Sequence, residues 1–139
     1  MTRGRVVVFG DHTPAAAQAL RWAVREAGRH DASVVVVRPF DLQARKDLTL
    51  ETDLDRARRD SRYRTQSWVI EAVADLATSV PVAVSTPDGS PVQALVQAAR
   101  GADLVVIGAD GVRAQQLADA IRPLCGCPVQ LGAEEPTAA

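Results

Sequence analysis

A chain of 139 residues with 47% apolar and 24% charged side chains has the size and composition of one globular domain that can bury a core. Its formal net charge of −1 gives no basic excess to attract nucleic acid or an anionic membrane. No apolar run approaches the length of a membrane span, and the run after Met1 is too short for a signal peptide, so we expect a soluble cytoplasmic protein.

The chain is predicted to begin with a strand, a helix and a second strand. Arg5–Phe9 and Ser33–Arg38 are apolar runs rich in valine, which is typical of strands covered on both faces. Between them Thr13 is a predicted N-cap for a helix that starts at Pro14 and stops at Gly28. The apolar residues of this helix fall on one face: Ala16, Leu20, Ala23, Val24 and Ala27.

The middle of the chain is predicted to hold a long connection, a long helix and a third strand. Pro39–Leu50 has no clear periodicity, and long connections of this kind are often functional or mobile. The helix is predicted from about Asp53 to Thr78, with a charged and solvated first half. Its second half carries one apolar stripe: Trp68, Val69, Ala72, Val73 and Leu76. The third strand is predicted over Val80–Thr86.

The last part of the chain is predicted to hold two helices and two strands. A third helix begins at Ser90 and Pro91, a fourth strand covers Leu104–Gly108, and a short edge strand covers Pro128–Leu131. The apolar stripes of the two helices are Val92, Leu95, Val96 and Ala99 in one and Leu117, Ala120, Ile121 and Leu124 in the other. We expect residues 1–133 to form the domain and residues 134–139 to be a flexible tail.

Strands that alternate with helices predict an α/β fold, with right-handed crossovers and a parallel sheet covered by helices on both faces. Ligands of such sheets bind outside the carboxyl ends of the strands. Gly10 and Asp11 follow the first strand, and Gly108 and Gly111 stand at the end of the fourth, where glycines let backbone amides approach an anion. Asp11 can instead bond within its own turn, and the glycines can serve only the turn.

Other chemistry-bearing residues give weaker signals. His12 is predicted to be a solvated loop residue, and no histidine has a ligand spacing, so we expect no metal. Cys125 and Cys127 are predicted to be free thiols in a turn, with no base placed to lower their pKa. The sequence has no nucleophile elbow, P-loop or dinucleotide fingerprint. No base-and-nucleophile pair is visible, and Asp11 with His12 is the one local acid–imidazole combination, so we expect no enzyme.

Several segments taken together resemble the universal stress protein family, over nearly the whole chain. They are Val6–Thr13, Ala19–Ala23, Asp88–Leu95, Ala102–Gly108 and Cys127–Val129. The resemblance implies a single three-layer Rossmann-like domain of the adenine nucleotide alpha hydrolase-like type, with a five-stranded parallel sheet in the order 3-2-1-4-5. It also implies a homodimer formed through the C-terminal strand, and many members of the family bind ATP.

The family's nucleotide motif is Gly-x-x-Gly, nine residues, then Gly-Ser or Gly-Thr. Gly108–Gly111 matches the first part, but Ile121 and Arg122 stand nine residues later. Alignment backwards from the cysteine-containing segment places the second part at Gln115–Gln116 and gives a shorter loop. Asp110 adds a negative charge inside the remaining turn. The resemblance therefore implies that part of the phosphate cradle is missing.

The resemblance also implies an adenosine pocket, formed by Gly10, Asp11, Val37, Ile107, Gly108 and Gly111. Asp11 would contact the ribose or base, and Val37 the adenine. We expect a non-catalytic stress-response or regulatory module that binds no ATP tightly, has no firm cofactor and acts through a small-molecule or protein partner. The alternative is a module that binds ATP or AMP through a remodelled loop, in which Arg38, Arg113 or Arg122 replaces the missing donors.

Overall fold

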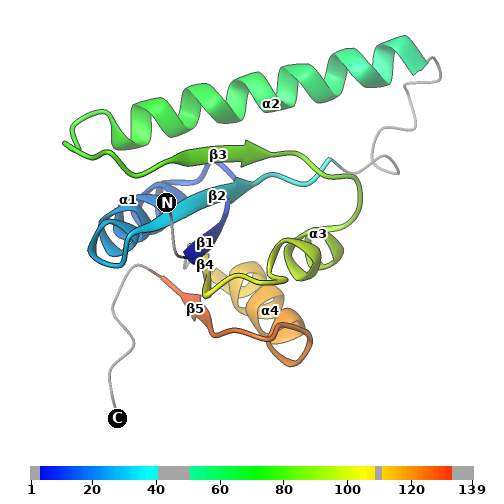
Figure 1. Ribbon diagram of the computed structural model, residues 1–139. Helices are drawn as coiled ribbons and strands as arrows, with labels where there is room; N and C mark the ends of the chain where they lie inside the picture. The colour runs from blue at the N-terminus through cyan, green and yellow to red at the C-terminus, as the bar shows by residue number, and fades with distance from the viewer. Residues whose placement is uncertain (1–3, 41–50, 109–110, 133–139) are drawn as a thin grey trace.

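The computed structural model describes residues 4–40, 51–108 and 111–132. Five parallel strands form one sheet in the order β3-β2-β1-β4-β5 (Figure 1), so the expected order is confirmed. The strands are β1 Gly4–Phe9, β2 Ala32–Val37, β3 Val82–Ser85, β4 Leu104–Ile107 and β5 Val129–Leu131. Each lies within the predicted run or one residue beyond it, because runs of buried valine and isoleucine suit a covered parallel sheet.

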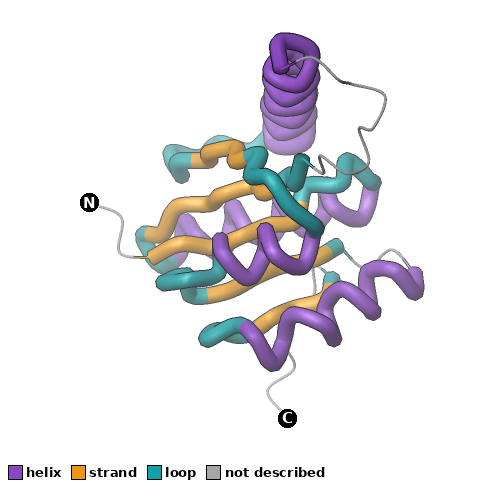
Figure 2. Tube along the Cα trace, turned by 90° about the vertical axis from the view of Figure 1, so that its right-hand side faces the viewer, coloured by secondary structure: helices purple, strands orange, loops and turns teal. Residues whose placement is uncertain are grey.

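Two helices cover each face of the sheet, which gives the three predicted layers (Figure 2). The helices α1 (Pro14–Arg29) and α2 (Glu51–Val73) pack on one face. The helices α3 (Pro91–Ala98) and α4 (Gly111–Ile121) pack on the other, and a 3-10 turn labelled η2 (Arg122–Leu124) follows α4. Ser90 caps α3 in a reciprocal capping box with Gln93, as its sequence position indicated.

The strand residues alternate between two separate cores. Val6 and Val8 of β1 pack with α1 and α2, whereas Val7 packs with α3 and α4. Val106 and Val105 of β4 divide in the same way. Because side chains point to opposite faces along a strand, a sheet covered on both sides needs an unbroken apolar sequence.

The end of α1 differs from the prediction that Gly28 stops the helix. Gly28 is helical and the helix continues to Arg29, with the His30 N–H donating to the Ala27 carbonyl at 3.2 Å. The left-handed residue that turns the chain is Asp31, with φ of 54°. Aspartate tolerates this conformation better than most residues, so the turn needs no glycine.

The long helix α2 starts and ends earlier than predicted, and it lies beside β3 (Figure 1). Beyond Val73 the chain turns, and Asp75 forms an ion pair with Arg21 of α1. The same guanidinium donates to the Ala72 carbonyl at 3.0 Å. The predicted apolar stripe does pack against the α1 side of the sheet, with Val69 buried and Trp68 partly buried.

The prediction for α4 is wrong at two positions, because Ala120 and Leu124 are exposed. The buried face of α4 is formed by Ala118 and Ile121. Pro123 stands in η2 and cannot continue an α-helix, so the chain tightens and Leu124 is 58% exposed.

Two predicted segments fall outside the described residues: most of the Pro39–Leu50 connection and the 134–139 tail. The domain boundary at residue 133 therefore stays a prediction. No helix in the described ranges has the length and apolar character needed to cross a membrane.

Candidate ligand-binding site

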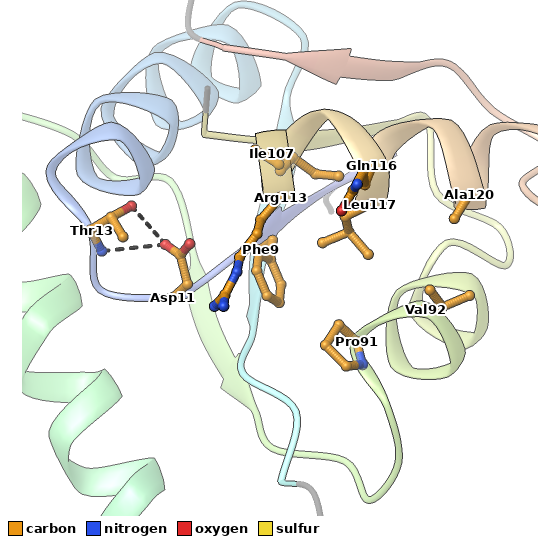
Figure 3. Close-up of a pocket in the computed structure, with 11 residues that line it drawn as sticks. Phe9, Asp11, Thr13, Pro91, Val92, Ile107, Arg113, Gln116, Leu117 and Ala120 are labelled. Carbon is orange, nitrogen blue, oxygen red and sulfur yellow. Dashed lines mark hydrogen bonds between the residues drawn. The ribbon is translucent and has the colours of Figure 1, made fainter. Parts of the chain in front are cut away.

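A pocket of about 640 Å³ opens at the carboxyl ends of β1 and β4, beside α3 and α4 (Figure 3). Its volume lies in the range of small-molecule sites, about 300–1,000 Å³. The lining residues are Phe9, Asp11, Thr13, Pro91, Val92, Ile107, Arg113, Ala114, Gln116, Leu117 and Ala120. They are mostly apolar, and none of them comes from β2, although the resemblance placed Val37 of the second predicted strand in the site.

Asp11 is held at the mouth of β1 by a short chain of hydrogen bonds. The Thr13 hydroxyl donates to Asp11 Oδ1 at 2.8 Å, and the Thr13 N–H donates to the same atom at 3.3 Å. The Thr13 hydroxyl in turn accepts from the Ala16 N–H at 3.1 Å, which makes Thr13 the N-cap of α1. Asp11 does bond within its own turn, while no described group donates to its other oxygen, Oδ2.

Arg113 supplies the positive charge of the pocket. It stands one turn before Gln116 on α4, and its side chain extends towards the end of β1 in Figure 3. Within the described residues Arg113 forms no ion pair, whereas Arg122 pairs with Asp119 at 2.8 Å. The described lining therefore contains one carboxylate, Asp11, and one guanidinium, Arg113.

Two of the six predicted site residues, Asp11 and Ile107, line the pocket. Gly10 and Val37 do not, because they are buried and bound to each other: the Gly10 N–H donates to the Val37 carbonyl at 2.9 Å. A Cβ at Gly10 would lie 2.5 Å from Val36 Cγ1, so packing between β1 and β2 requires the glycine. Val37 packs in the hydrophobic core that also contains residues of α3 and α4.

Gly108 and Gly111 also stay outside the lining. A Cβ at Gly108 would lie 2.6 Å from the backbone of both Ala15 and Ala16, so this glycine lets β4 approach the start of α1. Gly111 has φ of 78° and begins α4. Asp110 lies outside the described residues, and its predicted effect on phosphate stays a prediction.

His12 is a loop residue, as predicted, but it is partly buried rather than fully solvated. Its Nε2 lies 2.9 Å from Thr65 Oγ1, and its ring stacks on Trp68 with centroids 5.3 Å apart. Burial is the main cause that lowers the pKa of His12, and the positive charge of Arg38 adds to it. The described contacts of Asp11 include no hydrogen bond to His12, so the acid–imidazole pair of the sequence is not joined.

Of the three arginines suggested for a remodelled phosphate loop, only Arg113 reaches the pocket. Arg38 acts on His12 through its charge, and Arg122 is paired in η2. Gln116, where one alignment places the family's Gly-Ser pair, also lines the pocket.

The sequence reasoning missed the apolar wall of the pocket. Val92 and Leu117 have the spacing of helix core residues, and Phe9 ends a strand, so local patterns gave them no separate role. The available signal was topological, because the helices after β3 and β4 both begin at the carboxyl edge where Asp11 lies.

The cysteines lie away from this pocket. Cys125 and Cys127 are free and partly buried, and burial raises the pKa of each thiol. Across residues 4–40, 51–108 and 111–132, no group of three His, Cys, Asp or Glu side chains could hold a metal ion.

No curated protein matches the sequence. Among solved structures, a universal stress protein in complex with cAMP is 18% identical, with a TM-score of 0.64, over 94% of this chain and 97% of that chain. The universal stress protein from Archaeoglobus fulgidus in complex with dAMP is 22% identical, with a TM-score of 0.67, over 95% and 99%. The universal stress protein UspA from Lactobacillus plantarum is 20% identical, with a TM-score of 0.65, over 95% and 99%.

At these identities the solved structures show a shared fold. The family comes from the sequence itself, because the profile of the universal stress protein family matches residues 2–122, most of the 139 residues. The match spans all of β1 to α4, including every described residue of the pocket. The chain therefore belongs to the universal stress protein family.

Proposed function

We propose that this chain is a non-catalytic regulatory module that binds an adenine nucleotide with a single phosphate and does not bind ATP tightly. The observation that carries this proposal is the charge of the pocket, in which Arg113 is the one described cation. The apolar wall suits the nucleoside, and Asp11 Oδ2 suits the hydroxyls of a ribose.

A triphosphate would need more donors than the pocket offers. Hydrogen bonds to charged groups contribute about 1.5–3 kcal/mol each. A single guanidinium therefore supplies enough donors for one phosphate group but too few for the three phosphate groups of ATP. The α4 helix begins at Gly111, and its first turn carries Arg113 in place of a glycine-rich cradle. Two of the similar structures are complexes with cAMP and with dAMP, which are adenine nucleotides with a single phosphate.

We propose that the chain is not a catalyst because Asp11 and His12, the two candidate acid–base groups, are each bonded within the protein. Asp11 Oδ1 is engaged by the α1 cap, and His12 is turned to Thr65. A general acid or base must lie within hydrogen-bond reach of the substrate proton that it transfers, and the contacts of Asp11 and His12 direct these groups to partners within the protein. Incubation with AMP, cAMP and ATP, followed by chromatography, should therefore return each nucleotide unchanged.

Isothermal titration with AMP, cAMP, adenosine and ATP tests the binding proposal. We expect AMP or cAMP to bind, and ATP to bind more weakly than either. The Arg113→Gln variant should bind AMP about tenfold or more weakly than the wild type, because the phosphate loses its charged partner. Its affinity for adenosine, which has no phosphate, should be unchanged. Sub-micromolar ATP binding, or no binding of AMP and cAMP, would contradict the proposal.

Arg122→Gln is the matched control. It removes the same charge from the chain, but Arg122 pairs with Asp119 and does not line the pocket. Its affinity for AMP should equal that of the wild type. An equal loss in both variants would mean that net charge, rather than contact in the pocket, governs the binding of the nucleotide.

We also propose a homodimer formed through β5, in the cytoplasm. β5 is an edge strand of the sheet, and edge strands present unpaired backbone groups that can pair with a second copy. Light scattering coupled to size-exclusion chromatography measures the mass. A monomer at micromolar concentration would contradict the proposed dimer.

A further inference from the structure

The two phenylalanines of this chain are used in different ways. Phe40 is 2% exposed, and the guanidinium of Arg58 lies 5.3 Å from the centre of its ring. Phe9 is the last residue of β1 and is only partly buried, although Val6, Val7 and Val8 before it are buried. The ring of Phe9 lines the pocket.

The surroundings of Phe9 suit a flat ligand. Its ring lies in the pocket between the guanidinium of Arg113 and the side chain of Leu117 (Figure 3). Ile107 and Leu117 give the pocket further apolar surface, while the charged groups of Asp11 and Arg113 lie together on one side of the ring. No ring or cation among the described residues stacks on Phe9, in contrast to Phe40 and Trp68.

We propose that Phe9 is the stacking platform for the base of the ligand, and that it selects a planar heteroaromatic group over other phosphorylated compounds. The proposal rests on the proposed function, because the phosphate is assigned to Arg113. An aromatic face offers stacking energy to any base, whereas an aliphatic residue of similar size offers only apolar contact. In this proposal Phe9 selects the base of the ligand, and Arg113 binds its charged phosphate.

The test uses the monophosphate of 2-aminopurine riboside, whose fluorescence falls when the base stacks on an aromatic ring. Titration of the wild-type chain should give saturable quenching. Phe9→Leu keeps an apolar side chain without a π-face, so we expect about tenfold weaker binding and loss of the quenching. Phe9→Tyr keeps the ring and should retain both the affinity and the quenching.

Ribose 5-phosphate, which has no base, is the matched ligand. Its affinity should be the same in the wild type and in Phe9→Leu, whereas Arg113→Gln should weaken it. Circular dichroism and thermal unfolding establish that each variant is folded. If Phe9→Leu does not fold, the quenching of the wild-type complex and the behaviour of Phe9→Tyr still decide the question.

The outcomes separate this inference from the proposed function. Bound probe without quenching, or equal affinity of the wild type and a folded Phe9→Leu for the probe, overturns the role of Phe9 and leaves nucleotide binding intact. No binding of the probe, AMP or cAMP by the wild type overturns the proposed function and the inference together.

Discussion

His12 donates a hydrogen bond from Nε2 to the hydroxyl of Thr65, 2.9 Å away and 53 residues later in the chain. The direction follows from Thr65 itself, because its hydroxyl proton is donated to the Ser61 carbonyl at 2.9 Å and its oxygen can then only accept. Thr65 is fully buried, and the imidazole also stacks on Trp68. These contacts fasten the loop after β1 to the middle of α2.

The free energy of unfolding should fall as His12 is titrated by acid. Burial lowers the pKa of His12 below its ordinary value of 6.5, with Arg38 and Arg64 adding to the effect and Asp11 opposing it. The unfolded chain then binds this proton more readily than the folded chain. The contribution of His12 is therefore complete above about pH 6.5 and is lost as the pH falls below that value, which urea unfolding at a series of pH values measures.

The variant His12→Gln keeps a donor but does not titrate, so its stability should depend less on pH over this range. Circular dichroism at neutral pH is the control that His12→Gln is folded. If the pH dependence of His12→Gln equals that of the wild type, the explanation fails.

Removal of the Thr65 hydroxyl should destabilise the chain. Thr65→Val has nearly the same shape but removes the acceptor of the partly buried Nε2–H of His12, and the loss of a hydrogen bond of this kind costs about 1 kcal/mol. Thr65→Ser retains the hydroxyl and should lose less stability than Thr65→Val. Urea unfolding measures both, and the opposite ranking would show that the methyl group of Thr65 matters more than its hydroxyl.

Gly108→Ala should lower the free energy of unfolding by about 1–3 kcal/mol, because the added Cβ meets backbone that has little room to move. Gly126→Ala is the control, since a Cβ at Gly126 has nothing within 4 Å. Thermal unfolding compares the two variants. Equal melting temperatures for Gly108→Ala and the wild type would mean that α1 can shift away from β4.

The thiols of Cys125 and Cys127 should react slowly in the folded chain. Burial raises the pKa of both, which lowers the fraction of reactive thiolate at neutral pH. The rate of reaction with a chromogenic disulfide should increase on unfolding in urea. The same rate in the native and unfolded chain would contradict the protection by burial.

The strands and their parallel arrangement could be predicted from valine runs and helix caps, because these signals act locally, whereas the strand order came from the resemblance to the family. Thr13 with Pro14 and Ser90 with Pro91 marked two helix starts that the structure confirms. The location of Asp11 beside Ile107 followed from the topology of the sheet.

Features that depend on distant partners were not predictable in this way. His12 owes its burial to residues of α2, and Gly108 owes its requirement to the backbone of α1. Val37 has the sequence position of a ligand residue, yet its carbonyl is taken by Gly10. In each case a tertiary contact decides the role of the residue, and the residues near it in the sequence do not indicate that contact.

The two cores on opposite faces of the sheet have a spectroscopic consequence. Trp22 and Trp68, the only tryptophans in the sequence, both pack in the core of α1 and α2, while Phe9 and Leu117 of the pocket pack in the other. Tryptophan fluorescence therefore reports on the face of the sheet that α1 and α2 cover. It responds to the packing of α2 and not to a ligand in the pocket. A ligand screen read at tryptophan wavelengths would pass over binders that calorimetry detects.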